Sequence, residues 1–344
     1  MTPESHLPGY DPAFLGLRKR LYAESEPISV LDPTTGTQLS ELCLLTVNEC
    51  STHFKCLTHP SSYFSPSLRN TDTWNANRWS TLFTTIRRAR GWALARFMML
   101  TNEQSATLRK NAATSGYLSI TTEESFRVIP GNQTYTQYLG KRSSKHNANN
   151  RRCLKKAEKL GFSITNQLSV DEIADVYLRR TGKVGEADYS VTPQFIEFLR
   201  GLREAYLPQN RWVEVGVREP EGRLSAFAVG FWGENRIFYV FQTGYDPTHH
   251  SLRLGSLVFD SMIESTLNRG CSYLSFMSSS EYLANYASDT LRFNRVDVFN
   301  WNAKGIFLFA YRWLSNAYGQ LKSAAWRKQN ETRLDRSKMA ASGG

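Results

Sequence analysis

The sequence contains no uninterrupted apolar stretch near the roughly 18 residues that a membrane-spanning helix needs. Residues 1–6 lack a basic start followed by an apolar core, so no secretory signal is expected. The five cysteines, at positions 43, 50, 56, 153 and 271, are odd in number and scattered. They argue against a disulfide framework and fit a reducing compartment. These absences together predict a cytoplasmic protein.

A metal site is not expected either. Cysteine and histidine alternate at a uniform three-residue spacing in one short segment, at Cys50, His53, Cys56 and His59. Structural zinc sites instead use paired ligands separated by a longer stretch. This segment is interpreted as part of a strand or loop with incidental thiols.

With 344 residues, of which 41% are hydrophobic and 21% charged, the chain can form one large or two ordinary globular domains. Its net charge of +11 is concentrated in two places. Segment 141–160 carries eight cations against the single acid Glu158, and segment 322–338 carries six cations against two acids. A localised positive field attracts phosphate groups, whether on a nucleotide, a nucleic acid or a lipid headgroup.

Hydrophobic periodicity predicts an α/β protein. A first core strand is expected at 42–47, a helix over 73–99, and a basic helix over 135–161 that ends at Gly161. Residues 97–100 are expected to be either a strand or the end of the helix that begins at 73. Ser169 and Glu172 form a predicted capping box at the start of another helix. Strands are then expected at 212–217, 225–231, 237–242, 273–276 and 295–299, with helices opening at Pro193 and covering 255–268 and 306–325.

The most informative block is 237–280, which reads as a strand, a polar turn, a helix that begins at a glycine, and a second strand. Backbone N–H groups and the positive end of the helix dipole at residues 252–256 are suited to an anion such as the pyrophosphate of coenzyme A. The alternative is an ordinary turn in which Gly255 only permits close packing.

The order of elements from Tyr138 to Tyr282 resembles the GNAT acyltransferase superfamily. The most similar branch is that of cellulose-biosynthesis-type acetyltransferases and Fem-type aminoacyltransferases. The matching pieces are the basic helix 145–158, the hairpin 222–228, the run from Tyr239 to Pro247, the Leu254-Gly255 helix entry and the Gly270 strand entry. The chain departs from that branch where residues 278–286 replace a glycine-containing turn and a lysine, and in having one clear glycine in the pyrophosphate loop.

The resemblance implies a GNAT fold, a mixed central sheet flanked by helices, in a tandem Fem-like arrangement. With the composition of the two ends, the expected division has four parts: a weakly ordered segment 1–40, rich in Pro, Ser, Thr and Gly, a diverged GNAT-like half 41–160 with the basic helix, a GNAT acyltransferase domain 161–325, and a basic disordered tail 326–344.

The resemblance also implies roles for individual residues. The cofactor-binding set is expected to be Val240, Phe241 and Gln242, whose backbone pairs with a pantetheine arm or holds an oxyanion, and Leu252, Arg253, Leu254, Gly255 and Ser256 at the phosphates. Glu281 is the candidate general base, and Tyr282 or Tyr286 the candidate acid for the departing thiolate. The alternative is that Glu281 caps a helix and the tyrosines pack in the core. His249 and His250 are interpreted as loop residues or phosphate contacts.

The leading hypothesis is an acyltransferase that moves an acyl group from an acyl-CoA-type thioester to an amine or hydroxyl of a polar acceptor. It would need no metal and no tightly bound cofactor, with acyl-CoA as cosubstrate. Two alternatives stay open: a Fem-type transferase that uses an aminoacyl-tRNA, and a non-catalytic protein that binds nucleic acid or anionic lipid through basic helix 141–160.

Overall fold

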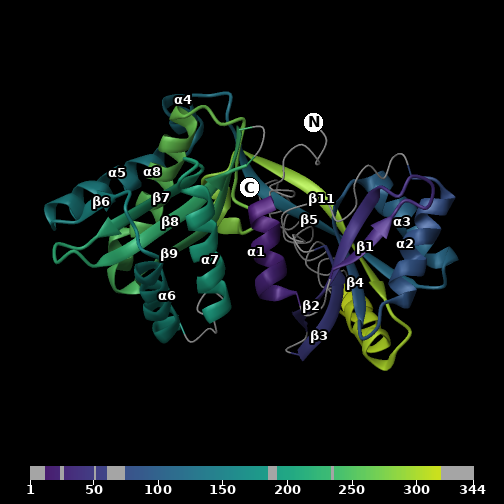
Figure 1. Cartoon of the computed structure of the whole chain (residues 1–344). Helices are drawn as coiled ribbons and strands as arrows, with labels where there is room; N and C mark the ends of the chain where they lie inside the picture. The colour runs from purple at the N-terminus through teal and green to yellow at the C-terminus, as the bar shows by residue number, and fades with distance from the viewer. Residues whose placement is uncertain are drawn as a thin grey trace, which may run out of the picture.

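The computed structural model describes residues 12–23, 27–49, 52–59, 74–184, 192–233 and 236–318. Within these ranges the strands form one eleven-stranded sheet with the order β1-β2-β3-β4-β11-β5-β10-β9-β8-β7-β6. Helices lie along both sides of this sheet (Figure 1). The mixed α/β architecture confirms the predicted fold class. The strand bounds are β1 Ile28–Leu31, β2 Gln38–Glu49, β3 Thr52–Thr58, β4 Leu94–Leu100, β5 Leu118–Pro130, β6 Ser163–Thr165, β7 Trp212–Arg218, β8 Leu224–Trp232, β9 Ile237–Tyr245, β10 Tyr273–Ser275 and β11 Asp289–Phe299.

Two parallel strand pairs occur in a sheet whose other described neighbours are antiparallel. β3 runs parallel to β4, with helix α2 (Ala76–Arg88) between them in sequence. β9 likewise runs parallel to β10, with helix α8 (Leu254–Asn268) between them. Antiparallel strands precede each unit, β1–β2–β3 in one half and β7–β8–β9 in the other. The same arrangement therefore occurs twice, as a tandem of two GNAT-like halves requires.

The two halves exchange their last strands. β5 follows the first unit in sequence but pairs with β10 of the second unit. β11 follows the second unit but pairs with β4 of the first. β5 and β11 also pair with each other along all eleven residues of β11, and Figure 1 shows them side by side between the halves. The expected boundary between residues 160 and 161 therefore does not separate two independent domains.

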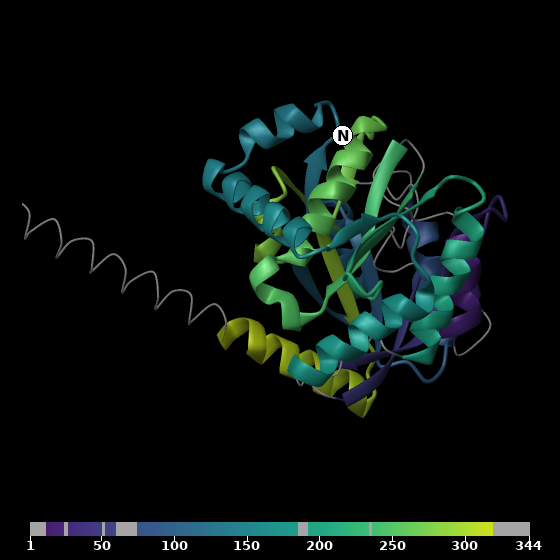
Figure 2. The same cartoon turned by 90° about the vertical axis from the view of Figure 1, so that its left-hand side faces the viewer.

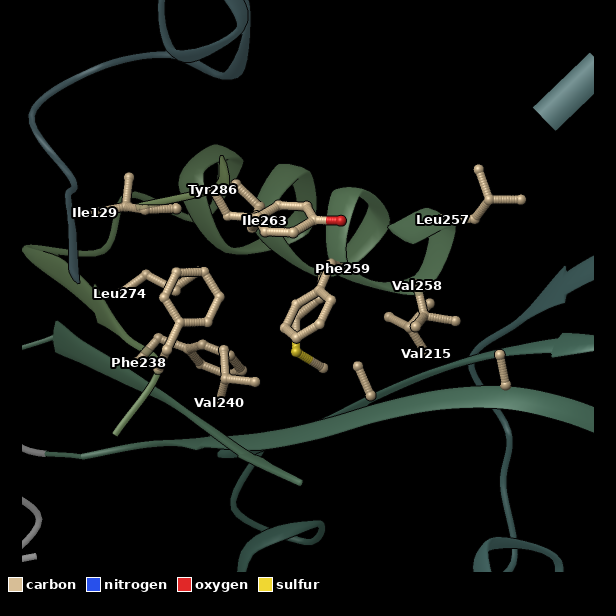
Figure 3. Packing of buried hydrophobic residues seen from close by; sticks show 14 of the residues in the cluster. Ile129, Val215, Phe238, Val240, Leu257, Val258, Phe259, Ile263, Leu274 and Tyr286 are labelled. Atoms are coloured by element: carbon tan, nitrogen blue, oxygen red, sulfur yellow. The ribbon is translucent and has the colours of Figure 1, made fainter. Parts of the chain in front are cut away.

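Helices cover both faces of the half-sheet that contains β7 to β10. On one face α8 packs with α4 (Tyr135–Lys141) and α5 (Ser144–Lys159), and on the other lie α1 (Pro12–Tyr22), α6 (Val170–Val184) and α7 (Pro193–Tyr206). β8 alternates accordingly: Ala226 and Ala228 face α8, whereas Phe227 and Phe231 face the other helices. The small alanines leave room for α8, whose apolar side chains lie directly over the sheet (Figure 3).

The first half has its own core. α2 and α3 (Asn102–Thr114) cover one face of its strands, with Trp79, Leu82 and Leu108 buried against Phe97. A helix at 303–318 covers the opposite face through Leu308. This helix was expected to belong to the second half but instead packs on the first.

Several sequence predictions agree with the structure and others need correction. Gly161 ends α5 with a φ of +81°, and Ser169 and Glu172 form the expected reciprocal capping box. The expected helix over 73–99 is wrong beyond Arg88, because Leu94–Leu100 forms the fully buried strand β4, which confirms the strand alternative for 97–100. The expected single helix over 135–161 is two helices, because Arg142 takes an extended conformation between them.

The expectation of a weakly ordered segment over 1–40 is wrong for the part that is described. Residues 12–22 form α1, whose Phe14 is fully buried and packs edge-on against Phe198 of α7 at 5.3 Å. β1 and the start of β2 occupy residues 28–40. The expected disordered tail 326–344 lies outside the described residues.

Candidate active site

The strands of the second parallel unit separate after three paired residues. β9 pairs with β10 from Ile237 to Tyr239 and then continues along β8 as far as Tyr245. The chain after β10 instead follows β5, because the Phe276 N–H donates to the Arg127 carbonyl. β9 therefore has no β10 partner over its second half.

A β-bulge accompanies this separation. The register between β8 and β9 shifts between Val229 and Gly230, so Phe241 is the extra residue on β9. A bulge bends its strand and increases the local twist. It lies directly after the last residues that β9 shares with β10, where the strand must turn away from its neighbour.

A cleft of about 790 Å³ opens between the separated strands. Its lining includes seven of the eleven residues proposed from the sequence: Val240, Phe241, Gln242, Arg253, Gly255, Ser256 and Tyr282. Further polar and charged residues of the lining are Thr243 of β9, Arg180 of α6, His250 before α8, and Ser278 and Ser280 after β10. The bend at residue 255 is therefore beside an open cleft rather than covered by other side chains.

Buried side chains and an ion pair fix the connection from β9 to α8. Asp246, which is 2% exposed, caps the short 3₁₀ helix η5 (Pro247–Leu252) by accepting from the Thr248 N–H at 2.8 Å. The same carboxylate pairs with Arg179 of α6 at 2.9 Å. Leu252 and Leu254 are buried in the core beneath. Their side chains anchor the turn and do not line the cleft, so only their backbone could face a ligand.

The first turn of α8 has no side-chain cap. Arg253 occupies the N-cap position with a left-handed φ of 51°, and no side chain accepts a hydrogen bond there. Uncapped N–H groups and the helix dipole favour an anion at this position. A Cβ on Gly255 would lie 3.3 Å from the Tyr245 ring, so glycine keeps the entrance to this turn open.

A short chain of hydroxyl groups leads from the helix start into the core. The Ser256 hydroxyl lies 3.5 Å from the Tyr282 hydroxyl, which lies 3.0 Å from that of Tyr286. Tyr282 lines the cleft and is 45% exposed, whereas Tyr286 is buried. Burial, reinforced by the neighbouring Tyr282, raises the pKa of Tyr286 above its usual range. Tyr286 therefore stays neutral and can supply or accept a hydrogen bond behind Tyr282.

Comparison with known proteins agrees with this geometry. Residues 144–286 match the family model described as an acetyltransferase (GNAT) domain. The chain carries a GNAT domain. No curated protein sequence matches the chain.

Solved structures support the same fold over most of the chain. The structure of FemX is 10% identical, with a TM-score of 0.56 over 86% of this chain and 93% of that one. The structure of L-PGS from Bacillus licheniformis is 11% identical, with a TM-score of 0.51 over 90% and 98%. A conserved protein from Bacteroides thetaiotaomicron VPI-5482 is 12% identical, with a TM-score of 0.50 over 86% and 93%. At these identities the likeness establishes the fold, and with the family match it supports an acyltransferase in general terms.

The matched GNAT domain begins with the basic helix, which the expected boundary had placed in the first half. α5 packs against α8 and η5 through its buried Asn150, Cys153 and Ala157. Asn150 donates to Asp260 of α8 at 2.8 Å, and Arg142, just before α5, pairs with the same carboxylate at 2.6 Å. The opposite face of α5 is open and positive: it presents Arg151, Arg152, Lys155, Lys156 and Lys159 around a shallow depression.

The carboxylate predicted as general base does not line the GNAT cleft. Glu281 is the first residue of the 3₁₀ helix η6 (Glu281–Asn285), is exposed, and does not line the cleft. Among the described residues no Asp or Glu lines the cleft, whereas Arg180, His250 and Arg253 do. Arg180 was missed by sequence reasoning, because no local motif connects α6 with a turn some seventy residues later.

A second polar cluster supports η5 from the side of β8. Glu219 accepts from Arg223 at 2.9 Å and from Ser225, and lies 3.2 Å from His249 Nε2. Burial works to raise the pKa of Glu219, but the hydrogen bonds from Ser225 and Arg223 outweigh it and hold the pKa below its usual range. His249 therefore supports the loop instead of facing the cleft, which His250 lines.

Within the described ranges, no group of three or more His, Cys, Asp or Glu side chains is placed to hold a metal ion. Of the four residues considered for zinc, Cys50 lies outside these ranges, His53 is exposed, and Cys56 and His59 are buried. No helix in the described part of the chain has the length and apolar character to span a membrane.

Proposed function

We propose that this GNAT domain transfers an acyl group from an acyl-CoA-type thioester to an amine or hydroxyl of a polar acceptor. The observation that carries the proposal is the cleft between β9 and β10, with the uncapped N-terminus of α8 beside it. An amide-lined helix start suits the pyrophosphate. Arg253, whose side chain lines the same cleft, adds a charge-assisted contact.

The free half of β9 suits the other end of the donor. Beyond Tyr239 this strand lacks a β10 partner, so its edge can hydrogen-bond to the amides of a pantetheine arm. A backbone N–H on this edge of β9 can also stabilise the oxyanion that forms when the acceptor attacks the thioester carbonyl, an effect worth about 3 kcal/mol.

The chemistry balances with the groups present. The acceptor nitrogen or oxygen bonds to the carbonyl carbon, the C–S bond breaks, and the thiolate takes a proton from the Tyr282 hydroxyl, which solvent in the cleft replenishes while Tyr286 stays neutral and keeps its hydrogen bond to Tyr282. The acceptor's own proton passes to water or to His250, because no described carboxylate lines the cleft. We assign Tyr282 rather than Tyr286 as the acid, since Tyr286 is buried behind it.

Isothermal calorimetry with CoA and acetyl-CoA tests the proposal. In Gly255→Glu a carboxylate stands over the first turn of α8, so CoA affinity is expected to fall at least tenfold, or about 1.4 kcal/mol. Gly16→Glu on α1 is the matched control, because that glycine is exposed and has no neighbour within 4 Å of an added Cβ. Absence of CoA binding by the wild type, or equal binding by Gly255→Glu, would contradict the proposal.

An aminoacyl-tRNA donor is the second candidate, and the position of the basic face of α5 favours it. This helix packs on η5, whose His250 lines the cleft, and carries its cationic side chains on its opposite, open face. A donor with a long phosphate backbone could use both. Aminoacyl transfer that requires tRNA, with no heat on addition of acetyl-CoA, would select this candidate over the first.

A further inference from the structure

Helix 303–318 exposes most of its large apolar side chains, whereas an ordinary surface helix buries them. Gly305, Leu308 and Arg312 face the protein: Gly305 approaches the backbone of Asn300 and Ala93, Leu308 is fully buried, and Arg312 pairs with buried Asp297. These three positions recur at three- and four-residue spacing and so share one side of the helix. They fix the rotation of the helix against the first half of the sheet.

The opposite side of the helix is apolar and largely exposed, although the Phe307 ring at its border also stacks on Phe54 of β3 at 6.3 Å. Six of its side chains, and Trp301 just before it, are between 44% and 69% exposed: Ile306, Phe307, Tyr311, Trp313, Leu314 and Tyr318. At 100° per residue these six, with Ala310 and Ala317, form one continuous stripe. Between Ile306 and Tyr318 the only charged residue is Arg312, which points inward. Figures 1 and 2 both show the helix, in yellow, at the periphery of the molecule.

Single exposed apolar residues are common, but a continuous exposed apolar patch marks an interaction surface. The composition of this stripe is that of an interfacial helix, in which Trp and Tyr lie at the boundary between water and hydrocarbon. The sequence that follows adds positive charge: segment 319–344 has six cations, Lys322, Arg327, Lys328, Arg333, Arg336 and Lys338, against two acids.

We propose that helix 303–318 docks the protein on the surface of an anionic lipid bilayer, with its apolar stripe in the headgroup region. At about 1.5 Å per residue the helix is about 24 Å long, enough to lie in the plane of the interface. Charge decides between a bilayer and a second copy of the chain. Two copies meeting through this stripe would bring together two proteins of net charge +11, whereas an anionic surface attracts both the chain and its basic C-terminal sequence.

This surface is separate from the GNAT cleft. The helix rests on β4 and β11 in the first half, whereas the cleft lies between β9 and β10 in the second. Docking is therefore independent of which donor the cleft accepts.

Vesicle co-sedimentation of the full chain is the test. Vesicles of phosphatidylcholine alone are compared with vesicles that also contain phosphatidylglycerol. The wild type is expected to bind the anionic vesicles more tightly, with a blue shift of tryptophan fluorescence and weaker binding at high salt. The double variant Trp313→Ser, Leu314→Ser removes two exposed apolar side chains. Its affinity for the anionic vesicles is expected to fall at least about tenfold.

Leu178→Ser on α6 is the matched control, because Leu178 is 57% exposed but lies on the second half, away from this helix. It is expected to bind vesicles like the wild type. Absence of wild-type binding, or equal binding by the double variant, would overturn the proposal. So would self-association that the double variant abolishes, which identifies a second copy as the partner. A double variant whose melting temperature falls by many degrees would also overturn it, since the stripe would then be covered by the chain itself.

Discussion

Asp297 is the residue whose replacement should cost the protein most stability. Its side chain is fully buried between Arg96 of β4, Arg295 of β11 and Arg312 of helix 303–318. Arg96 Nε donates to Asp297 Oδ1 at 2.9 Å, and Arg295 Nε donates to Oδ2 at 3.1 Å. One carboxylate thus connects an exchanged strand with the other half of the sheet and with the terminal helix.

The substitution Asp297→Asn keeps the shape of this side chain and removes its charge. Arg96 is 3% exposed, so its guanidinium would stay in the interior without the carboxylate that balances it. Removal of one partner from a buried ion pair costs about 3–5 kcal/mol. We expect the free energy of unfolding, measured by urea denaturation and circular dichroism, to fall by that amount. The slope m of this free energy against urea concentration should change little.

Glu123→Gln is the matched control. Glu123 of β5 pairs with Arg292 of β11, the strand that also carries Asp297, but these side chains are 65% and 75% exposed. An exposed ion pair contributes about 0–1 kcal/mol, so this variant should unfold almost like the wild type. A loss of less than about 1 kcal/mol in Asp297→Asn, or an equal loss in both variants, would refute the reasoning from burial.

Two further predictions concern the cleft and the loop beside it. Tyr282→Phe should lower kcat for acyl transfer about a hundredfold while calorimetric CoA affinity is unchanged, and Tyr286→Phe should lower it less; the reverse order would reassign the acid. The pKa of Glu219 is lower in the folded chain than unfolded, so its stabilisation is fully present above about pH 4.5 and is lost as pH falls below that value. The stability of Glu219→Gln should therefore depend less on pH in that acidic range, and an unchanged pH profile in thermal unfolding would count against the network around η5.

Local patterns in the sequence predicted the second half well. Apolar alternation and turn residues marked β7, β8 and β9, and Gly255 marked the entry into α8. These are short-range effects of side-chain size and backbone conformation, so they can be read from a window of a few residues. The position of the cleft followed from them, because a strand, a turn and a helix in this order bring β9 and the start of α8 together.

Long-range pairing was not predictable in the same way. β11 alternates like any half-buried strand, and nothing in its own residues says that it pairs with β4 and β5 rather than with β10 alone. Arg180 reaches the cleft from α6, which is distant in sequence. Phe14 reads as part of a polar lead-in, yet it fills a space between α7 and β8 that exists only after both have folded. The bulge at Phe241 depends on the register with β8 and leaves no residue signature.

The exchange of β5 and β11 has a consequence for the order of events during synthesis. β4 is completed at residue 100, but the strand that closes its free edge is not made until residue 299. At about 5–20 residues per second the ribosome needs on the order of 10–40 s to cover that distance. For that time the buried strand β4 has one open edge on the nascent chain, so aggregation of unfinished chains is the hazard that this topology creates, and a chaperone that holds the first half until release would suppress it.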